Sequence, residues 1–167
     1  MRKYLTLFIS LVLAGCAASG TRFQLADPPS GNDAAVYIYR PDANFLITAW
    51  PEIFINSEEK FALKHKGYGV VYLAPGQHTI RAEGSLIRTG WHLPPVELTQ
   101  QFEPNQTYFI RVLPRLGSVY MVSNTVVSEG HVEIARVPKE QALSEISTTR
   151  SVQNSSEKMV FMGMTMD

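Results

Sequence analysis

Short apolar runs alternate with polar turns along most of the chain from position 34 onward. The first run, residues 34–41, reads AAVYIYRP and is rich in β-branched and aromatic residues, which is typical of a strand. At Pro75-Gly76 the proline fixes φ at one turn position and the glycine tolerates the positive φ of the next, so a turn is predicted there. Runs spaced about 8 to 12 residues apart predict a mostly β protein folded as an antiparallel β-sandwich.

Nine segments share this strand pattern. They are residues 34–41, 52–56, 60–64, 68–73, 77–83, 96–102, 107–114, 118–127 and 131–137. Turns are predicted between them at 56–59 and 115–117, among others. One short C-terminal helix is predicted after Pro138, because Ala142, Leu143 and Ile146 recur at helical spacing.

The first 15 residues have the layout of a secretory signal peptide. An Arg-Lys pair precedes an apolar run, residues 4–15, which is too short to span a bilayer comfortably since that takes about 20 residues. The run ends in LAGC, residues 13–16, which resembles the lipobox of bacterial lipoproteins. In that family the signal is cleaved before the cysteine, diacylglycerol is attached to its thiol and the new amine is acylated. The alternative is an ordinary signal peptide followed by a free thiol.

This resemblance implies that Cys16, the one cysteine of the chain, is a membrane anchor. Two or more acyl chains hold a protein stably on a bilayer, whereas one holds it marginally. In the lipoprotein family an aspartate after the cysteine tends to retain the product at the inner membrane, and here Ala17 follows it. The resemblance therefore implies an outer-membrane lipoprotein that faces the periplasm.

Composition divides the remainder into three parts. Residues 16–33 are rich in Ser, Gly, Pro, Asn and Asp and are expected to form a lipidated flexible tether. Residues 34–147 form the predicted β-sandwich domain with its helix, and residues 148–167 a polar linker with a Met-rich tail. Without the signal, 13 basic residues face 15 acidic ones, a net charge of about −2. This gives no basic field for nucleic acid.

Three sequences in the body of the chain carry a second resemblance. They are AAVYIYRP at 34–41, IFIN at 53–56 and LKHKGYGVVYLAPGQHTI at 63–80. Together they resemble a family of uncharacterised bacterial lipoproteins known as a domain of unknown function, similar to the short PEGA-type β domains. The resemblance implies a small β-sandwich on a lipid anchor. It implies no activity, because the family has none to transfer.

Candidate chemistry is sparse. The histidines, His65, His78, His92 and His131, have no metal-binding spacing, and no G-x-S-x-G nucleophile motif occurs. His78 is expected to pack and to hydrogen-bond in its strand. The sequence therefore predicts a protein that is not an enzyme and needs no cofactor.

Two aromatic segments, residues 44–50 and 88–95, lie outside the clearest strands. They contain Phe45, Trp50 and Trp91, which are candidates for contact with a partner since exposed apolar patches often mark interfaces. The alternative is that both segments fold over one end of the sandwich and complete its core.

The last ten residues, KMVFMGMTMD, place Met162, Met164 and Met166 at alternating positions. Thioethers are soft ligands that suit Cu(I), so these are weak candidates for a metal site. The alternative is a last strand whose methionines fill gaps on one face.

The sequence thus favours a non-catalytic interaction or structural module of the envelope, anchored through Cys16 and contacting an envelope protein or peptidoglycan. The second hypothesis is a Cu(I)-binding lipoprotein that uses the Met-rich tail, and an enzyme is the third.

Overall fold

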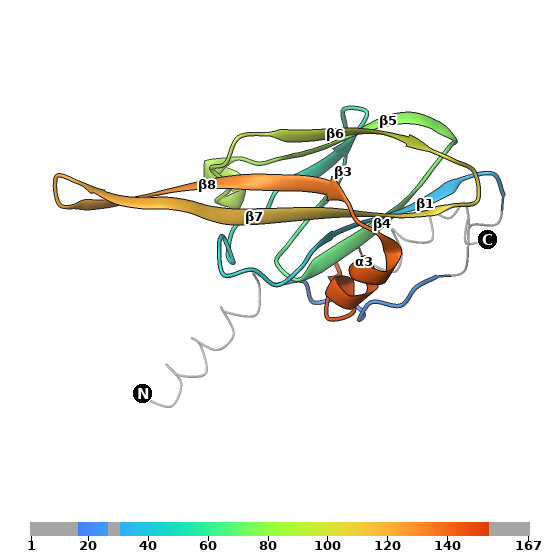
Figure 1. Ribbon diagram of the computed structural model, residues 1–167, viewed down its shortest axis with the longest axis horizontal. Helices are drawn as coiled ribbons and strands as arrows, with labels where there is room; N and C mark the ends of the chain where they lie inside the picture. Colours follow the sequence, from blue (N-terminus) through green and yellow to red (C-terminus); the bar gives the residue numbers. More distant parts are fainter. Residues whose placement is uncertain (1–16, 27–30, 154–167) are drawn as a thin grey trace.

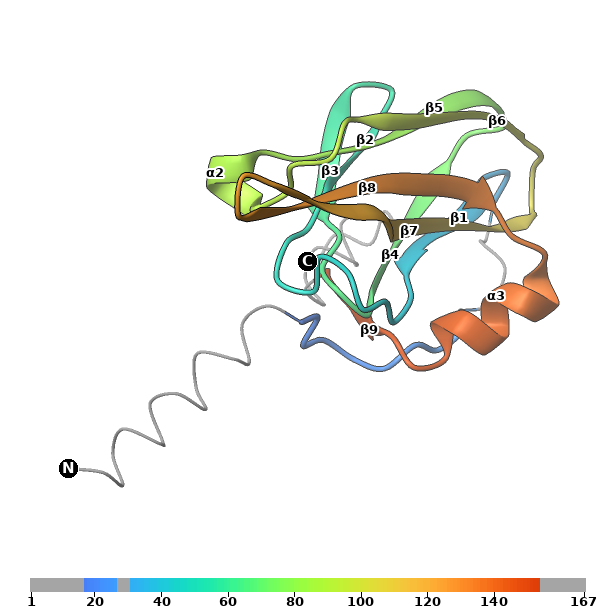
Figure 2. The same cartoon turned by 60° about the vertical axis from the view of Figure 1, so that its left-hand side comes forward.

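Residues 17–26 and 31–153 are described by the computed structural model, and they form two β-sheets packed face to face with a third layer on one side (Figures 1 and 2). The elements are β1 (Ala34–Arg40), β2 (Glu52–Ile55), β3 (Glu58–Ala62), β4 (Gly67–Leu73), β5 (Gly76–Glu83), α2 (Leu86–Thr89), β6 (Val96–Phe102), β7 (Thr107–Val122), β8 (Thr125–Arg136), α3 (Lys139–Ile146) and β9 (Arg150–Ser151). One sheet has the order β8-β7-β1-β4-β9 and the other β3-β2-β5-β6. The prediction of a mostly β protein with a short C-terminal helix is confirmed.

The larger sheet is mixed, which corrects the expectation of purely antiparallel strands. β1 pairs antiparallel with β4 but parallel with β7, and β9 adds parallel to β4. Parallel neighbours need a long connection, and the chain between β1 and β7 supplies one because it builds the whole second sheet. Every residue of β1 is buried, as expected for a central strand covered on both faces.

The main core lies between the two sheets. It includes Val36 and Ile38 of β1, Ile53 of β2, Ile80 of β5 and Phe102 of β6. A second core lies on the other face of the larger sheet, where α3 and the N-terminal segment cover it (Figure 2). That face presents alternate residues of the same strands, because successive side chains of a strand point to opposite sides.

The N-terminal segment, residues 17–26, lies against the domain, where the sequence predicts a flexible tether. Ala17 bridges to His65, and the backbone N–H of Phe23 donates to the carbonyl oxygen of Thr149 at 3.0 Å. The ring of Phe23 packs edge-on against Tyr37 and Tyr68, with centroids 5.6 and 5.3 Å apart. Backbone hydrogen bonds and the ring of Phe23 together thus hold the segment on the domain.

The start of the predicted C-terminal linker is also ordered against the domain. Residues 150–151 form β9, and the Gln153 side chain is buried, with its amide donating to the carbonyl oxygen of Val70 and its oxygen accepting from the Val70 N–H. The side-chain amide makes the two hydrogen bonds that a neighbouring strand would make with Val70. The polar composition of this segment does not predict such an interaction.

The predicted turn at 115–117 is wrong. β7 continues through it to Val122, and the chain reverses at Ser123-Asn124, whose φ angles are 45° and 65°. Two consecutive positive φ values are what a two-residue hairpin turn demands, and Asn tolerates them better than most residues. Gly117 instead lies where the register of β7 and β8 shifts, between Leu116 and Val119.

Candidate functional site

Several segments meet at the end of the sandwich where β1 finishes, which we call the Arg40 end. Gly67 pairs with Arg40, so the chain enters β4 there, and the bridge from Ala17 to His65 brings the N-terminal segment to the same place. Loops 41–51 and 84–95 also lie at this end, since Glu52 and Glu83 are paired beside them. Strands β7 and β8 continue past it as a hairpin (Figure 1).

Arg40 is fully buried and holds loop 41–51 by its carbonyl groups. Its guanidinium donates to the backbone oxygens of Ala49 at 2.6 Å, Leu46 at 2.5 Å and Phe45 at 3.2 Å. Burial lowers the pKa of Arg40 to about 10, so the group stays charged at neutral pH. Its guanidinium carbon also lies 5.6 Å from the centroid of the Trp91 ring.

Loops 41–51 and 84–95 bury Trp91 in a small core, so Trp91 does not form a docking surface. Trp91 is 1% exposed and packs with Ala49 and Leu93, with Phe45 and Leu46 partly buried against them, a group that we call the Trp91 cluster. Trp91 as a partner contact is therefore wrong, because its ring has no surface to offer. Phe45 is half-buried and contacts β8 at Gly130, and Trp50 is half-buried beneath the ammonium group of Lys64.

His65 lies beside this cluster and is also buried. Its Nε2 atom is 3.2 Å from the Oδ1 atom of Asp42, and Lys66 pairs with the other carboxylate oxygen at 2.6 Å. Burial, followed by the charge of Arg40, lowers the pKa of His65. The imidazole is therefore neutral at pH 7 and hydrogen-bonds to an exposed carboxylate that Lys66 already neutralises.

The hairpin arm, residues 115–129, is the part of this end that the sequence-based interpretation missed. It carries exposed apolar side chains on β7: Leu116 is 52% exposed, Val119 55%, Tyr120 43% and Met121 70%. The Tyr120 hydroxyl donates to Glu129 across the hairpin at 2.9 Å, on the face opposite to that of Val119 and Met121. A usable signal was the run between Arg115 and Glu129, which contains no charged residue.

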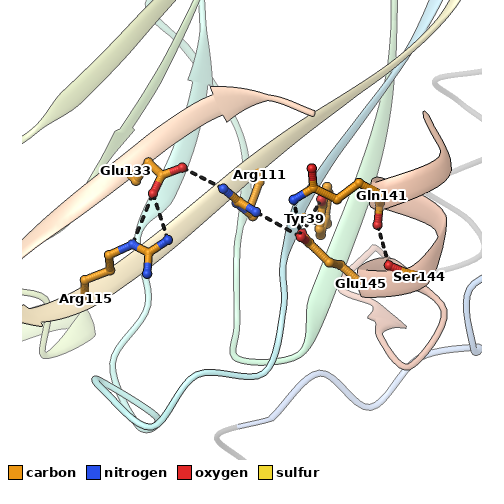
Figure 3. Close-up of polar contacts among 7 residues, drawn as sticks. All are labelled: Tyr39, Arg111, Arg115, Glu133, Gln141, Ser144 and Glu145. Atoms are coloured by element: carbon orange, nitrogen blue, oxygen red, sulfur yellow. Dashed lines mark hydrogen bonds and ion pairs between the residues drawn. The ribbon is translucent and has the colours of Figure 1, made fainter. Parts of the chain in front are cut away.

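A polar network attaches α3 to the larger sheet (Figure 3). Arg111 lies between two carboxylates, 2.6 Å from Glu133 and 2.9 Å from Glu145, and the Tyr39 hydroxyl donates to Glu145 at 2.7 Å. The hydrogen bond from Arg111 lowers the pKa of Glu133. Burial raises that of Glu145, but hydrogen bonds from Tyr39, Gln141 and Arg111 outweigh it and lower the pKa. Both carboxylates are held in the ionised form, which favours the ion pairs with Arg111. An ionised carboxylate has no proton to donate, so neither group is suited to act as an acid.

The residues of the resemblance motifs meet each other as expected of a structural role. The Nδ1 atom of His78 lies 2.8 Å from the side-chain nitrogen of Asn56, and its Nε2 atom lies 2.9 Å from the carbonyl oxygen of Ala74. Since Asn56 also accepts from the Thr79 N–H, the pair ties the β2–β3 turn to β5. The prediction that His78 hydrogen-bonds is confirmed.

Two groups of predicted site residues fall outside the described residues. These are Cys16 and the methionines Met162, Met164 and Met166. Over residues 17–26 and 31–153, no group of three or more His, Cys, Asp or Glu side chains could hold a metal ion. Within the same ranges no helix is long and apolar enough to cross a membrane.

Comparison with known proteins places the chain in a family. The family model described as "Protein of unknown function (DUF2846)" matches residues 30–126, more than half of the chain. The chain belongs to the DUF2846 family. The DUF2846 match runs from just before β1 to the second strand of the hairpin arm, and so includes Arg40 and Trp91. Neither a curated protein nor a solved structure matches the chain.

Proposed function

We propose that this protein is a lipid-anchored, non-catalytic interaction module of the bacterial envelope, held at the periplasmic face of the outer membrane through Cys16. The LAGC sequence at residues 13–16 supports the anchor, and the resemblance of the body to lipoproteins related to PEGA-type domains supports the envelope. The proposed role is to bring the Arg40 end to an envelope component, a protein, peptidoglycan or the membrane itself. A permanent anchor raises the local concentration of such a module near its target.

The observation that carries the binding role is the hairpin arm. A soluble domain gains stability by burying apolar side chains, and the described residues of the arm leave four of them exposed on an extension of the sheet. The arginines of the domain serve attachment: the buried Arg40 binds loop carbonyls and the half-buried Arg111 joins two carboxylates. These arrangements support contact rather than chemistry as the role.

Two experiments test this proposal. Metabolic labelling with an alkyne fatty acid should mark the wild-type protein but not a Cys16→Ser variant, and loss of the difference would overturn the anchor. In-cell cross-linking of the lipidated protein should then capture an envelope component that a Val119→Ser/Met121→Ser variant loses. Leu25→Ser is the matched control, since Leu25 is 42% exposed on the N-terminal segment and not on the arm. Equal capture by all three proteins would remove the arm as the working surface.

A further inference from the structure

We propose that the Arg40 end rests on the same bilayer that holds Cys16, with α2 and the hairpin arm lying in the headgroup region. This inference rests on the proposed function, because it needs the lipid at Cys16. It goes further by naming the bilayer surface as the envelope component that the arm contacts. Four observations carry it: the place where the chain leaves the domain, the distribution of exposed apolar side chains, the charge of the arm and its open edges.

The described chain begins at the Arg40 end. Ala17 bridges to His65, the Ala18 N–H donates to the His65 carbonyl oxygen at 3.2 Å, and the Gly20 N–H donates to that of Ser151 at 3.2 Å. Cys16 is the next residue, about 3.8 Å away between Cα atoms. Acyl chains on Cys16 would therefore attach directly beside the domain, and this end could not lie far from the membrane surface.

Exposed apolar side chains concentrate at this end. Eight large apolar side chains are exposed among the described residues, and all but Leu25 belong to loop 41–51, α2 or the arm. The seven are Ile47, Leu86, Ile87, Leu116, Val119, Tyr120 and Met121. Ile87 of α2 is 98% exposed; Figure 2 shows α2 at one end of the sandwich, and Figure 1 shows that the arm projects beyond that end. Side chains placed like this would be withdrawn from water by a bilayer that lies across the end.

The charge of the arm suits a membrane surface. From Leu116 to Ser128 the chain contains no Asp, Glu, Lys or Arg, whereas Arg115 and Glu129 bound this run on the side of the domain. Charged side chains are the costly ones to bring toward a bilayer, and Tyr is among the residues enriched at the membrane–water interface. The arm thus lacks the groups that would oppose contact.

The open edges of the arm limit its depth. Past the end of β1 the arm consists of β7 and β8 alone, so both strands carry backbone N–H and C=O groups without a neighbouring strand. Such groups are not tolerated in the hydrocarbon core, where no water can bind them. The arm should therefore lie along the headgroup region, with Val119 and Met121 toward the acyl chains and the hydrogen-bonded Tyr120–Glu129 pair on the other face among the headgroups.

Site-specific fluorescence on the full lipidated protein tests this arrangement. Since Cys16 is the only cysteine, a new cysteine that replaces Met121 or Ile87 would be the single free thiol for an environment-sensitive NBD label. Gln77→Cys is the control, because Gln77 is exposed at the opposite end of the sandwich, at the start of β5. The proteins are reconstituted in vesicles of phosphatidylethanolamine and phosphatidylglycerol, with and without spin-labelled lipids that quench NBD.

Labels at Met121 and Ile87 should show blue-shifted emission that the spin-labelled lipids quench, and the label at Gln77 should show neither. If either test label stays as water-exposed as the one at Gln77, the inference is wrong. A blue shift without quenching would mean burial against a second copy or another protein, and would also overturn it. The intact mass separates the two proposals: without acyl chains on Cys16 both fail, whereas an acylated protein with water-exposed labels removes this inference alone.

Discussion

The Trp91 cluster and the hairpin arm both lie at the Arg40 end of the sandwich, and both contain large apolar side chains. In the cluster, Trp91 is 1% exposed and Ala49 and Leu93 are buried with it. In the arm, Met121 is 70% exposed and Val119 55%. The sequence left two interpretations open for the aromatic loops, a partner contact or completion of the core, and it predicted only a turn and a strand where the arm lies.

The two regions differ in burial because only one of them has a partner for its backbone groups inside the domain. Loop 41–51 folds back because Arg40 offers a buried guanidinium to its carbonyl groups, which satisfies backbone that would otherwise lose its water. The arm has no such partner, because β1 ends at Arg40 and β7 runs on with β8 alone. An apolar residue in a loop is therefore no evidence of a binding surface when a buried donor binds the carbonyl groups of that loop.

The largest effect is expected from Trp91→Ala. Truncation of a buried tryptophan typically costs about 3–5 kcal/mol of unfolding free energy, because it removes buried area and leaves a cavity. Urea denaturation followed by circular dichroism measures it. Trp50→Ala is the control, since that ring is half-buried and its loss should cost less. Equal costs for the two variants would contradict the assignment of Trp91 to the core.

Arg40→Met should have the next largest effect. It keeps the length of the side chain but leaves the carbonyl groups of Phe45, Leu46 and Ala49 without their donor, at a cost of about 2–3 kcal/mol. Hydrogen exchange should rise in loop 41–51 before it rises in β1. Arg40→Lys retains a charge but not the planar fork, so it should recover part of the loss. A fully stable Arg40→Met variant would show that loop 41–51 closes without the guanidinium.

Acid should release α3, which the half-buried Arg111 attaches to the sheet through Glu145. The folded-state pKa values of Glu133 and Glu145 lie below their usual 4.5. The two ionised carboxylates therefore contribute fully to the unfolding free energy above pH 4.5, and this contribution is lost as the pH falls through the lowered values. Thermal unfolding measured from pH 7 down to pH 3 should show this loss. In Glu145→Gln, which cannot titrate at that position, the decline should be shallower. An identical pH profile would remove Glu145 from the linkage.

Local pattern was sufficient for most elements of the fold. The tight turn at Asn56-Ser57, which is shorter than the predicted 56–59, the bend at Pro75 and the helix after Pro138 follow from φ preferences and spacing within a few residues. The double burial of β1 was visible in its unbroken apolar run, although the parallel partner was not. Pairing of β1 with β7 joins segments about 70 residues apart, and no local signal specifies it.

The candidate site was harder to predict because it depends on where strands end relative to one another. Gly117 looked like a turn, but it lies at a register shift, and the chain reverses at Ser123-Asn124 instead. Residues 115–129, predicted as a turn at 115–117 followed by a strand at 118–127, therefore form one projecting arm. Pro114 was a clue: it has no N–H to donate, and it stands where β7 has passed the end of β1.

The smallest effect on stability is expected on the arm, and it separates the two regions most sharply. Val119→Ser replaces an apolar side chain that is 55% exposed, so the unfolding free energy should change by no more than about 0.5 kcal/mol. Val36→Ser is the matched substitution at a position with no exposure in β1, and it should cost several times more because a hydroxyl would enter the core. Urea denaturation of both variants gives the comparison. If Val119→Ser were as costly as Val36→Ser, the arm would be part of the fold's own core rather than a surface for contact, and the proposals built on its exposure would fall together.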